Sequence, residues 1–465
     1  MRACPRASGA GAVTRNPMGT HPNTDSKTIE THRSNLGRAL VLHPVLRGVE
    51  TARSPEASLE EAVGLAAAID LDVVQAVLVK VSQPRPATLL GGGAIEQQAK
   101  LLEDAREAGE PIDLVIVDHL LTPVQQRNLE RAFGAKVIDR TGLILEIFGA
   151  RARTHEGQLQ VELASLTYQK SRLVRSWTHL ERQRGGFGFL GGPGESQLEL
   201  DRRLIGNRIV KIKRELDDVR RTRGLHRKAR AKVPYPVVAL VGYTNAGKST
   251  LFNRMAGADV FARDLLFATL DPTMRQVVLP SGGKAILSDT VGFISDLPTH
   301  LVAAFRATLE EVQSADIILH VRDIAHPDTE AQKADVEAIL SDLGIDPERD
   351  PRVVEVSNKI DLLDGAEREA VLARAERSGN ACALSAATGE RLDTLFRILD
   401  GRMTAGRELV ELDVEHGDGA TLAWLYAHGE VVGRRDDDSH AHLQVAIEPA
   451  TLARLGHPGQ ERAAA

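Results

Sequence analysis

The residues with the clearest capacity for chemistry form a glycine-rich run that follows an apolar stretch and precedes a helical pattern. The run contains the pattern GxxxxGK[ST] as Gly242, Gly247, Lys248 and Ser249. Its glycines allow backbone N–H groups to turn inward around phosphates, and the following helix adds the partial positive charge of its N-terminus. The lysine can reach the β- and γ-phosphates, and the serine hydroxyl can ligate Mg²⁺. The predicted nucleotide contacts in this run are Gly242, Tyr243, Thr244, Asn245, Ala246, Gly247, Lys248 and Ser249.

A second motif, DTVG, begins at Asp289 behind an apolar strand pattern. Its aspartate would hold Mg²⁺, directly or through water, and the Gly292 N–H would contact the γ-phosphate. The segment FATLDPT before it occupies the place of a first switch, where we expect Thr269 to reach Mg²⁺, with Thr273 as the alternative. The predicted metal ligands are Ser249 and Thr269, and the predicted catalytic residues are Lys248, Thr269 and Gly292. Further predicted nucleotide contacts are Phe267, Ala268, Thr269, Leu270, Asp271, Asp289, Thr290, Val291 and Gly292.

Two motifs nearer the C-terminus predict which base is bound. In the NKID motif, the Asp361 carboxylate would accept hydrogen bonds from guanine N1–H and the exocyclic amine, which adenine cannot donate. The SA pair that follows the next strand would contact the guanine oxygen through backbone N–H groups. Each short motif alone is weak evidence, but all four in order, each behind an apolar strand, predict a guanine-nucleotide site. The predicted contacts are Asn358, Lys359, Ile360, Asp361, Ser385 and Ala386.

One position departs from many small GTPases. Phe293 stands where a glutamine commonly orients the attacking water, and a phenyl ring cannot do so. Hydrolysis is therefore expected to be slow, or to be completed by a partner, by another switch residue or by a cation. Asn245 resembles the asparagine that coordinates K⁺ in some bacterial GTPases, so K⁺ joins Mg²⁺ among the expected cofactors.

The elements that must position these motifs are strands alternating with helices, and they extend over most of the 465 residues. Apolar β-branched runs between helical patterns are typical of α/β domains with largely parallel sheets. We expect an α/β multidomain protein with a small N-terminal α/β domain, an antiparallel helical hairpin, a P-loop GTPase domain and a small C-terminal α+β domain. The expected bounds are a disordered tail over 1–37, then domains over 38–150, 151–233, 234–405 and 406–465.

The predicted hairpin carries an unusual charge. Two heptad-like seams, from Leu159 and from Ile205, flank the stretch Gly185–Gly194, which is expected to be a loop exposing Phe187 and Phe189. Between residues 202 and 232 there are 13 Lys or Arg against three acids, although the whole chain has a net charge of −6. A basic helix is most often only a solvated face. Local positive charge beside an aromatic loop nevertheless favours contact with RNA.

The chain resembles a known family over residues 38 to 455. The block RARTHEGQLQVELA from Arg151, the segment GGPGESQLELDRR from Gly191, FATLDPT and DTVGF are similar to motifs of the HflX GTPases. Where that family commonly has threonines, this chain has Ser196 and Leu200. The resemblance implies a translation-factor-like GTPase that binds the large ribosomal subunit and its RNA and splits or rescues stalled ribosomes. It also implies nucleotide contacts at the motif positions given above, with Ser249 and Thr269 on Mg²⁺.

Two other functions fit the same motifs. One is a GTPase that modifies tRNA or rRNA, but the two cysteines, Cys4 and Cys382, offer no modification site. The other is a scaffold, gated by guanine nucleotide, that binds a protein through the hairpin. The cysteines form no disulfide pattern, and no apolar run approaches the roughly 20 residues of a membrane span. We therefore expect a cytoplasmic monomer without a membrane span. Peripheral association with a membrane is compatible with this expectation. The expected small-molecule partners are GTP and GDP.

Overall fold

We describe the chain from a computed structural model. Several predictions fall outside the described residues: those for residues 1–36 of the 1–37 tail, for Phe187 and Phe189, and for Ala268 and Asp271. The structure describes residues 37–48, 53–183, 193–230, 235–257, 266–267, 269–270, 272–295, 306–404, 408–447, 452 and 455.

The N-terminal domain is built on a four-stranded parallel sheet in the order β2-β1-β3-β4. Helix starts are encoded locally. Ser54 accepts a hydrogen bond from the N–H of Ala57 ahead of α1, and Thr122 and Gln125 form a reciprocal capping box ahead of α3. The elements are β1 (Arg38–Leu46), α1 (Pro55–Ala67), β2 (Asp72–Val81), α2 (Gly92–Glu107), β3 (Leu114–Val117), α3 (Pro123–Phe133), β4 (Lys136–Asp139) and α4 (Arg140–Arg151).

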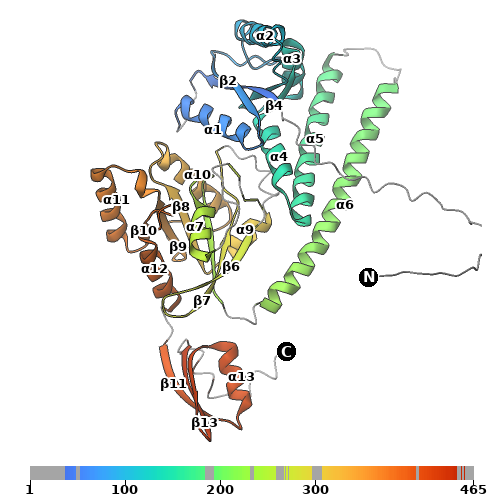
Figure 1. Ribbon diagram of the computed structural model, residues 1–465. Helices are drawn as coiled ribbons and strands as arrows, with labels where there is room; N and C mark the ends of the chain where they lie inside the picture. The colour runs from blue at the N-terminus through green and yellow to red at the C-terminus, as the bar shows by residue number, and fades with distance from the viewer. Residues whose placement is uncertain are drawn as a thin grey trace, which may run out of the picture. The chain divides into compact units, whose positions relative to one another are not determined.

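Two long helices, α5 (His155–Gln183) and α6 (Pro193–Arg230), run antiparallel to one another as the seams predict (Figure 1). Leu159 packs against Ile212 and Leu216, all three of which are buried. The predicted loop Gly185–Gly194 falls outside the described residues up to residue 192, and its last two residues, Pro193 and Gly194, belong to α6 instead. Proline suits the first turn of a helix, where its missing N–H has no helical partner.

The GTPase domain contains a six-stranded sheet in the order β10-β9-β8-β5-β7-β6. All neighbouring strands are parallel except β6, which pairs antiparallel with β7 at one edge. The elements are β5 (Val237–Gly242), α7 (Lys248–Ala256), β6 (Thr273–Val278), β7 (Lys284–Asp289), α9 (Arg306–Gln313), β8 (Ile317–Asp323), α10 (Thr329–Asp342), β9 (Val353–Asn358), η2 (Ile360–Leu362), α11 (Gly365–Ser378), β10 (Ala381–Ala383) and α12 (Leu392–Thr404).

The C-terminal domain is a three-stranded antiparallel sheet in the order β11-β13-β12 with one helix. Its core is a separate apolar cluster that includes Val414, Leu425 and Leu443. The elements are β11 (Glu408–Glu415), α13 (Gly419–His428), β12 (Glu430–Asp436) and β13 (His440–Ile447). These sheets confirm the predicted α/β multidomain class. None of the helices within the described ranges combines the length and apolar character needed to cross a bilayer.

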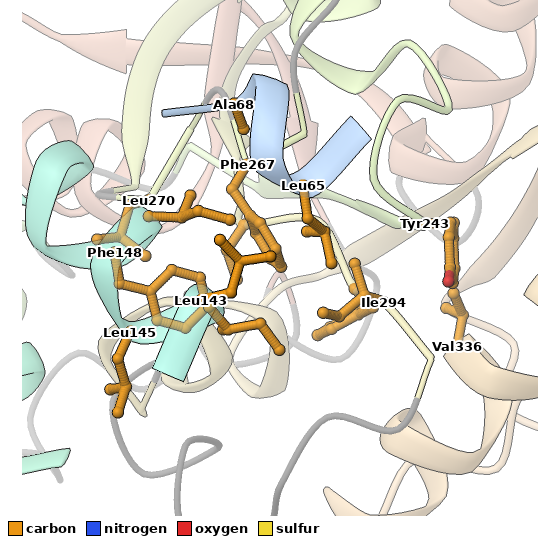
Figure 2. Packing of buried hydrophobic residues seen from close by; sticks show 14 of the residues in the cluster. Leu65, Ala68, Leu143, Leu145, Phe148, Tyr243, Phe267, Leu270, Ile294 and Val336 are labelled. Atoms are coloured by element: carbon orange, nitrogen blue, oxygen red, sulfur yellow. The ribbon is translucent and has the colours of Figure 1, made fainter. Parts of the chain in front are cut away.

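One apolar cluster is shared by the N-terminal and GTPase domains (Figure 2). It joins Leu65 of α1 and Phe148 of α4 to Tyr243, Phe267 and Ile294, which lie in segments predicted to surround the nucleotide. Each of these side chains is at most 4% exposed. The segments predicted to bind phosphates therefore take part of their apolar support from the N-terminal domain.

Candidate GTP-binding and hydrolysis site

The glycine-rich run forms the loop between β5 and α7. Gly242 has φ +152°, and a Cβ atom there would lie 2.1 Å from the carbonyl oxygen of Val321 on β8. Gly247 has φ +90°, and a Cβ there would lie 2.2 Å from the side-chain nitrogen of Asn358. Only glycine fits these two positions, because each combines a positive φ with a close approach of other atoms. The path of the loop therefore depends on both glycines.

Lys248 opens helix α7 and is 6% exposed. Its ammonium group donates a hydrogen bond of 2.7 Å to the carbonyl oxygen of Tyr243. Burial lowers the pKa of Lys248 to about 8, against the attraction of Asp289. Phosphates bound along the loop would favour the charged ammonium, because an opposite charge nearby stabilises the ionised form.

Three oxygen-bearing side chains from three separate segments meet beside Lys248. The Ser249 hydroxyl lies 2.7 Å from the Asp289 carboxylate and 2.9 Å from the Thr269 hydroxyl. Thr269 lies 2.9 Å from the same carboxylate oxygen, Oδ2. The other carboxylate oxygen, Oδ1, is buried and has no hydrogen-bond partner within the described structure. Burial raises the pKa of Asp289, although the hydrogen bonds from Ser249 and Thr269 oppose this shift.

This donor set fits Mg²⁺, which prefers oxygen ligands and retains several waters. A buried oxygen without a partner is unfavourable, and a cation beside it would relieve that cost. Ser249, Thr269 and Asp289 would hold the ion, directly or through water, and the ion would neutralise charge on the β- and γ-phosphates. Across the described ranges, no group of three or more His, Cys, Asp or Glu side chains gathers as an alternative metal site.

Gly292 approaches the glycine-rich loop very closely. A Cβ atom at Gly292 would lie 2.8 Å from Cγ2 of Thr244 and 2.9 Å from Nζ of Lys248. The adjoining backbone pairs with the same loop: Thr244 N–H donates to the Phe293 carbonyl at 2.7 Å, and Phe293 N–H donates to the Gly242 carbonyl at 3.1 Å. This pairing sets Gly292 beside the lysine that would meet the terminal phosphates.

The side chain of Phe293 belongs to the interior of the protein. It is 2% exposed and lies in the apolar cluster shared with the N-terminal domain. The position that carries glutamine in many small GTPases is therefore a packing position here. Its side chain cannot orient a water molecule, in agreement with the sequence-based argument.

The NKID motif begins with the last residue of β9 and connects the predicted phosphate side of the site to the predicted base side. The Asn358 amide nitrogen donates to the Ala246 carbonyl at 2.8 Å, and its oxygen accepts from the Ala386 N–H at 2.9 Å. Lys359 has φ +68°, and its ammonium forms a 2.7 Å ion pair with Asp323 at the end of β8. The motif thus fixes three loops at the carboxyl edge of the sheet, where open α/β sheets bind ligands.

The residues predicted to recognise the base lie on η2 and in the loop after β10. Asp361 is exposed on η2, so its carboxylate is accessible to a base. The Ser385 N–H donates to the Glu390 carbonyl at 3.1 Å, and the Ala386 N–H donates to Asn358 as described above. The two N–H groups predicted to contact the guanine oxygen therefore already have protein acceptors, as buried N–H groups require. Arg254 of α7 holds this loop by donating to the carbonyls of Ala386, at 3.3 Å, and Ala387.

Most of the predicted site residues come together at this edge of the sheet. Thr269 lies beside Ser249 and Asp289, whereas Thr273, the alternative, is the first residue of β6. Ala268 and Asp271 cannot be placed, because they lie outside the described ranges. The sequence reasoning missed Asp323 and Arg254. Asp323 could have been found from its position at the end of a central strand, where site residues gather. Arg254 lies on an exposed helix face, where an arginine is common and gives no such signal.

Comparison with protein families assigns most of the chain between residues 56 and 456. Residues 237–359 match the family described as 50S ribosome-binding GTPase, and residues 370–456 match the HflX C-terminal domain. Residues 56–149 match the GTP-binding GTPase N-terminal family, and residues 151–230 match the GTP-binding GTPase middle region.

Individual relatives agree with these matches. The GTPase HflX of Magnetococcus marinus is 49% identical over 429 residues, which cover 92% of this chain and 96% of the relative. That of Escherichia coli is 46% identical over 398 residues, covering 85% of this chain and 91% of the relative. Among solved structures, a GTP-binding protein of Sulfolobus solfataricus in complex with GDP is 22% identical, with a TM-score of 0.43, over 79% of this chain and 99% of that one. The chain belongs to the HflX family of GTPases, and it binds and hydrolyses GTP.

Proposed function

We propose that this GTPase is a nucleotide-dependent switch that associates with the large ribosomal subunit and splits or rescues stalled ribosomes. The observation that carries the proposal is the cationic surface of α6. Arg202, Arg203, Lys211, Lys213 and Arg214 of that helix are all exposed. Exposed cations on a long helix provide the charge that binds RNA phosphates.

Two of the ion pairs along the described part of α6 join exposed side chains. Lys211 lies 3.8 Å from Glu215, and Arg221 lies 3.8 Å from Asp218, with all four side chains at least 35% exposed. Exposed pairs of this kind contribute little free energy, so RNA phosphates can compete for the same cations. The match of residues 237–359 to a 50S ribosome-binding GTPase family supports the choice of the large subunit as the RNA-containing partner. Such a partner would place the protein in the cytoplasm.

At the site itself, Lys248, Ser249, Thr269 and Gly292 would bind the phosphates and Mg²⁺, and Asp361 would select guanine. Since Phe293 cannot position water, we propose that the ribosome completes the catalytic site. Asn245 offers a second route. It is exposed in the phosphate-binding loop with φ +60°, and K⁺ held by its side-chain oxygen would add positive charge beside the phosphates. Equal turnover in KCl and NaCl at one ionic strength would exclude this role for K⁺.

The decisive experiment measures GTP turnover with and without purified large subunits, together with pelleting in a non-hydrolysable GTP analogue and in GDP. We expect faster turnover with subunits and pelleting that is selective for the GTP analogue, because a switch must bind its partner with different affinities in its two states. If ribosomes do not change the turnover and the protein does not pellet with them, the GTPase activity still stands, but the ribosome is not its partner.

Charge reversal separates specific binding from general attraction. The double variant Arg202→Glu, Arg203→Glu should pellet weakly, and its binding should depend less steeply on salt concentration. The matched control reverses two exposed cations of the N-terminal domain, Arg131→Glu and Lys136→Glu. Equal loss in both double variants would point to net charge rather than to α6 as the contact.

A further inference from the structure

We infer that the N-terminal domain positions Thr269 for GTP hydrolysis, and that Phe148 and Gly64 are the positioning residues. The inference rests on the GTPase activity and is independent of the ribosome proposal. It concerns the two residues that flank the Thr269 region, Phe267 and Leu270, and the surface of the N-terminal domain on which they lie (Figure 2).

Phe267 is held in an unfavourable backbone conformation. Its φ is +55°, in the left-handed region that bulky side chains avoid, and its side chain is 2% exposed. Residues in such conformations persist where the surrounding structure holds them. The packing of the Phe267 ring must therefore offset the energetic cost of this backbone conformation.

The packing comes from the N-terminal domain. The Phe267 ring meets the Phe148 ring of α4 edge to face, with centroids 4.9 Å apart and planes at 89°, a favoured aromatic geometry. The preceding residue, Leu266, lies against α1, where a Cβ atom added to Gly64 would be 3.1 Å from its Cδ1 atom. Glycine at this helical position leaves the space that Leu266 occupies.

Thr269 lies between two apolar anchors in the sequence. Phe267 precedes it by two residues and Leu270, 7% exposed, follows it directly, and both belong to the cluster shared with the N-terminal domain. With these neighbours fixed, the Thr269 hydroxyl lies 2.9 Å from Ser249 and 2.9 Å from Asp289. Because Leu270 is its direct neighbour in the chain, an anchored Leu270 limits how far Thr269 can move away.

Loss of this positioning should affect the GTP-bound state more than the GDP-bound state. A threonine in the first switch contributes to the Mg²⁺ site when GTP is bound, so a loosened Thr269 should weaken the GTP state and slow hydrolysis while sparing GDP. A variant that only destabilised the fold would weaken both nucleotides alike. The ratio of the two affinities therefore distinguishes positioning from general stability.

The test compares Phe148→Ala with Phe133→Ala, which truncates another buried phenylalanine of the N-terminal domain that lies in a different apolar cluster. For Phe148→Ala we expect kcat and the affinity for a non-hydrolysable GTP analogue with Mg²⁺ to fall about tenfold, with the affinity for GDP changed less than about twofold. Phe133→Ala should leave the ratio of the two affinities unchanged. Phe148→Leu, which keeps most of the volume, should restore most of the turnover.

Gly64→Ala gives an independent approach, because its methyl group would press on Leu266 without removing any core side chain. It should shift the ratio of GTP-analogue to GDP affinity in the same direction as Phe148→Ala. A double-mutant cycle with Thr269→Ala then closes the argument, since Phe148→Ala should add no further loss of kcat once the hydroxyl is gone. Equal losses for both nucleotides, or additive losses in the cycle, would overturn the inference. Should Phe148→Ala fail to fold, an unchanged ratio in folded Gly64→Ala would overturn it as well.

Discussion

The side chain of Asn358 donates a hydrogen bond of 2.8 Å to the carbonyl oxygen of Ala246, in the middle of the phosphate-binding loop. Through its oxygen, the same amide holds the N–H of Ala386 in the base-binding loop at 2.9 Å. Asn358 is 2% exposed, so water cannot replace either bond. One buried side chain thus fixes the distance between the two halves of the nucleotide site.

Asn358→Ala should therefore weaken binding of GDP and GTP alike. Two buried backbone groups would lose their partners, at a cost of ~3 kcal/mol, or roughly a hundredfold in affinity. Calorimetric titration with each nucleotide measures the effect. Asn380→Ala is the matched control, because the Asn380 amide also donates to a backbone carbonyl, that of Val353 at 2.8 Å, but away from the site. Similar losses of nucleotide affinity in both variants would contradict the prediction.

Gly242→Ala should unfold the GTPase domain or destabilise it by more than ~3 kcal/mol. The added Cβ would sit 2.1 Å from the Val321 carbonyl oxygen, at a backbone position with φ +152°. Gly282→Ala separates the effect of the steric contact from the effect of the positive φ. Gly282 has φ +88°, but no atom lies within 4 Å of the Cβ that alanine would add. That variant should lose only about 1 kcal/mol. Urea unfolding of both proteins gives the comparison, and equal stability losses would show that contact with Val321 is unimportant.

Installing glutamine at position 293 should not accelerate hydrolysis. Phe293 is 2% exposed within an apolar cluster, so Phe293→Gln would bury an amide without a partner at a cost of about 3 kcal/mol. We expect lower stability in urea and unchanged or slower turnover. Phe293→Leu, which remains apolar, should unfold at a higher urea concentration than Phe293→Gln. A tenfold gain in turnover for Phe293→Gln would show that the side chain can leave the core and orient water.

Acid should destabilise the contact between the N-terminal and GTPase domains. Burial alone would raise the pKa of Glu61, but the Arg140 guanidinium and a hydrogen bond from Tyr243 lower it below its ordinary value of 4.5. A lowered pKa means that the charged group stabilises the folded state fully above pH 4.5. This stability is lost as the pH falls through the lowered pKa. Urea midpoints measured from pH 7 downward should therefore drop more steeply below pH 4.5 in the wild type than in Glu61→Gln. Parallel curves would contradict the prediction.

Local sequence rules predict the elements that begin and end with distinctive residues. Helix α3 is such an element, because a proline opens it and Gly134, with φ +59°, closes it. Helix α4 was not predicted. It starts directly after β4, with Asp139 as its cap, and is buried on most sides, so it shows neither a separating loop nor an amphipathic period.

The functional site likewise has a part that could be predicted from the sequence and a part that could not. The four motifs could be read from sequence because each is a short contiguous segment whose chemistry depends on its own residue types. Contacts between residues far apart in the sequence are not encoded in any such short segment. Phe148 and Phe267 come into contact only through tertiary packing, and the arginine that holds the base-binding loop, Arg254, has no pattern around it. Likewise, nothing in the sequence indicated that the N–H groups of Ser385 and Ala386 donate to oxygens of the protein itself.

The apolar cluster that the N-terminal and GTPase domains share limits how far this protein is modular. A fragment cut to the GTPase domain alone would present Tyr243, Phe267, Leu270 and Ile294 to water, and such a surface favours aggregation. The C-terminal domain encloses an apolar cluster of its own, so its core does not depend on those side chains. The N-terminal and GTPase domains, by contrast, complete one another's cores and form a single unit of stability around the nucleotide.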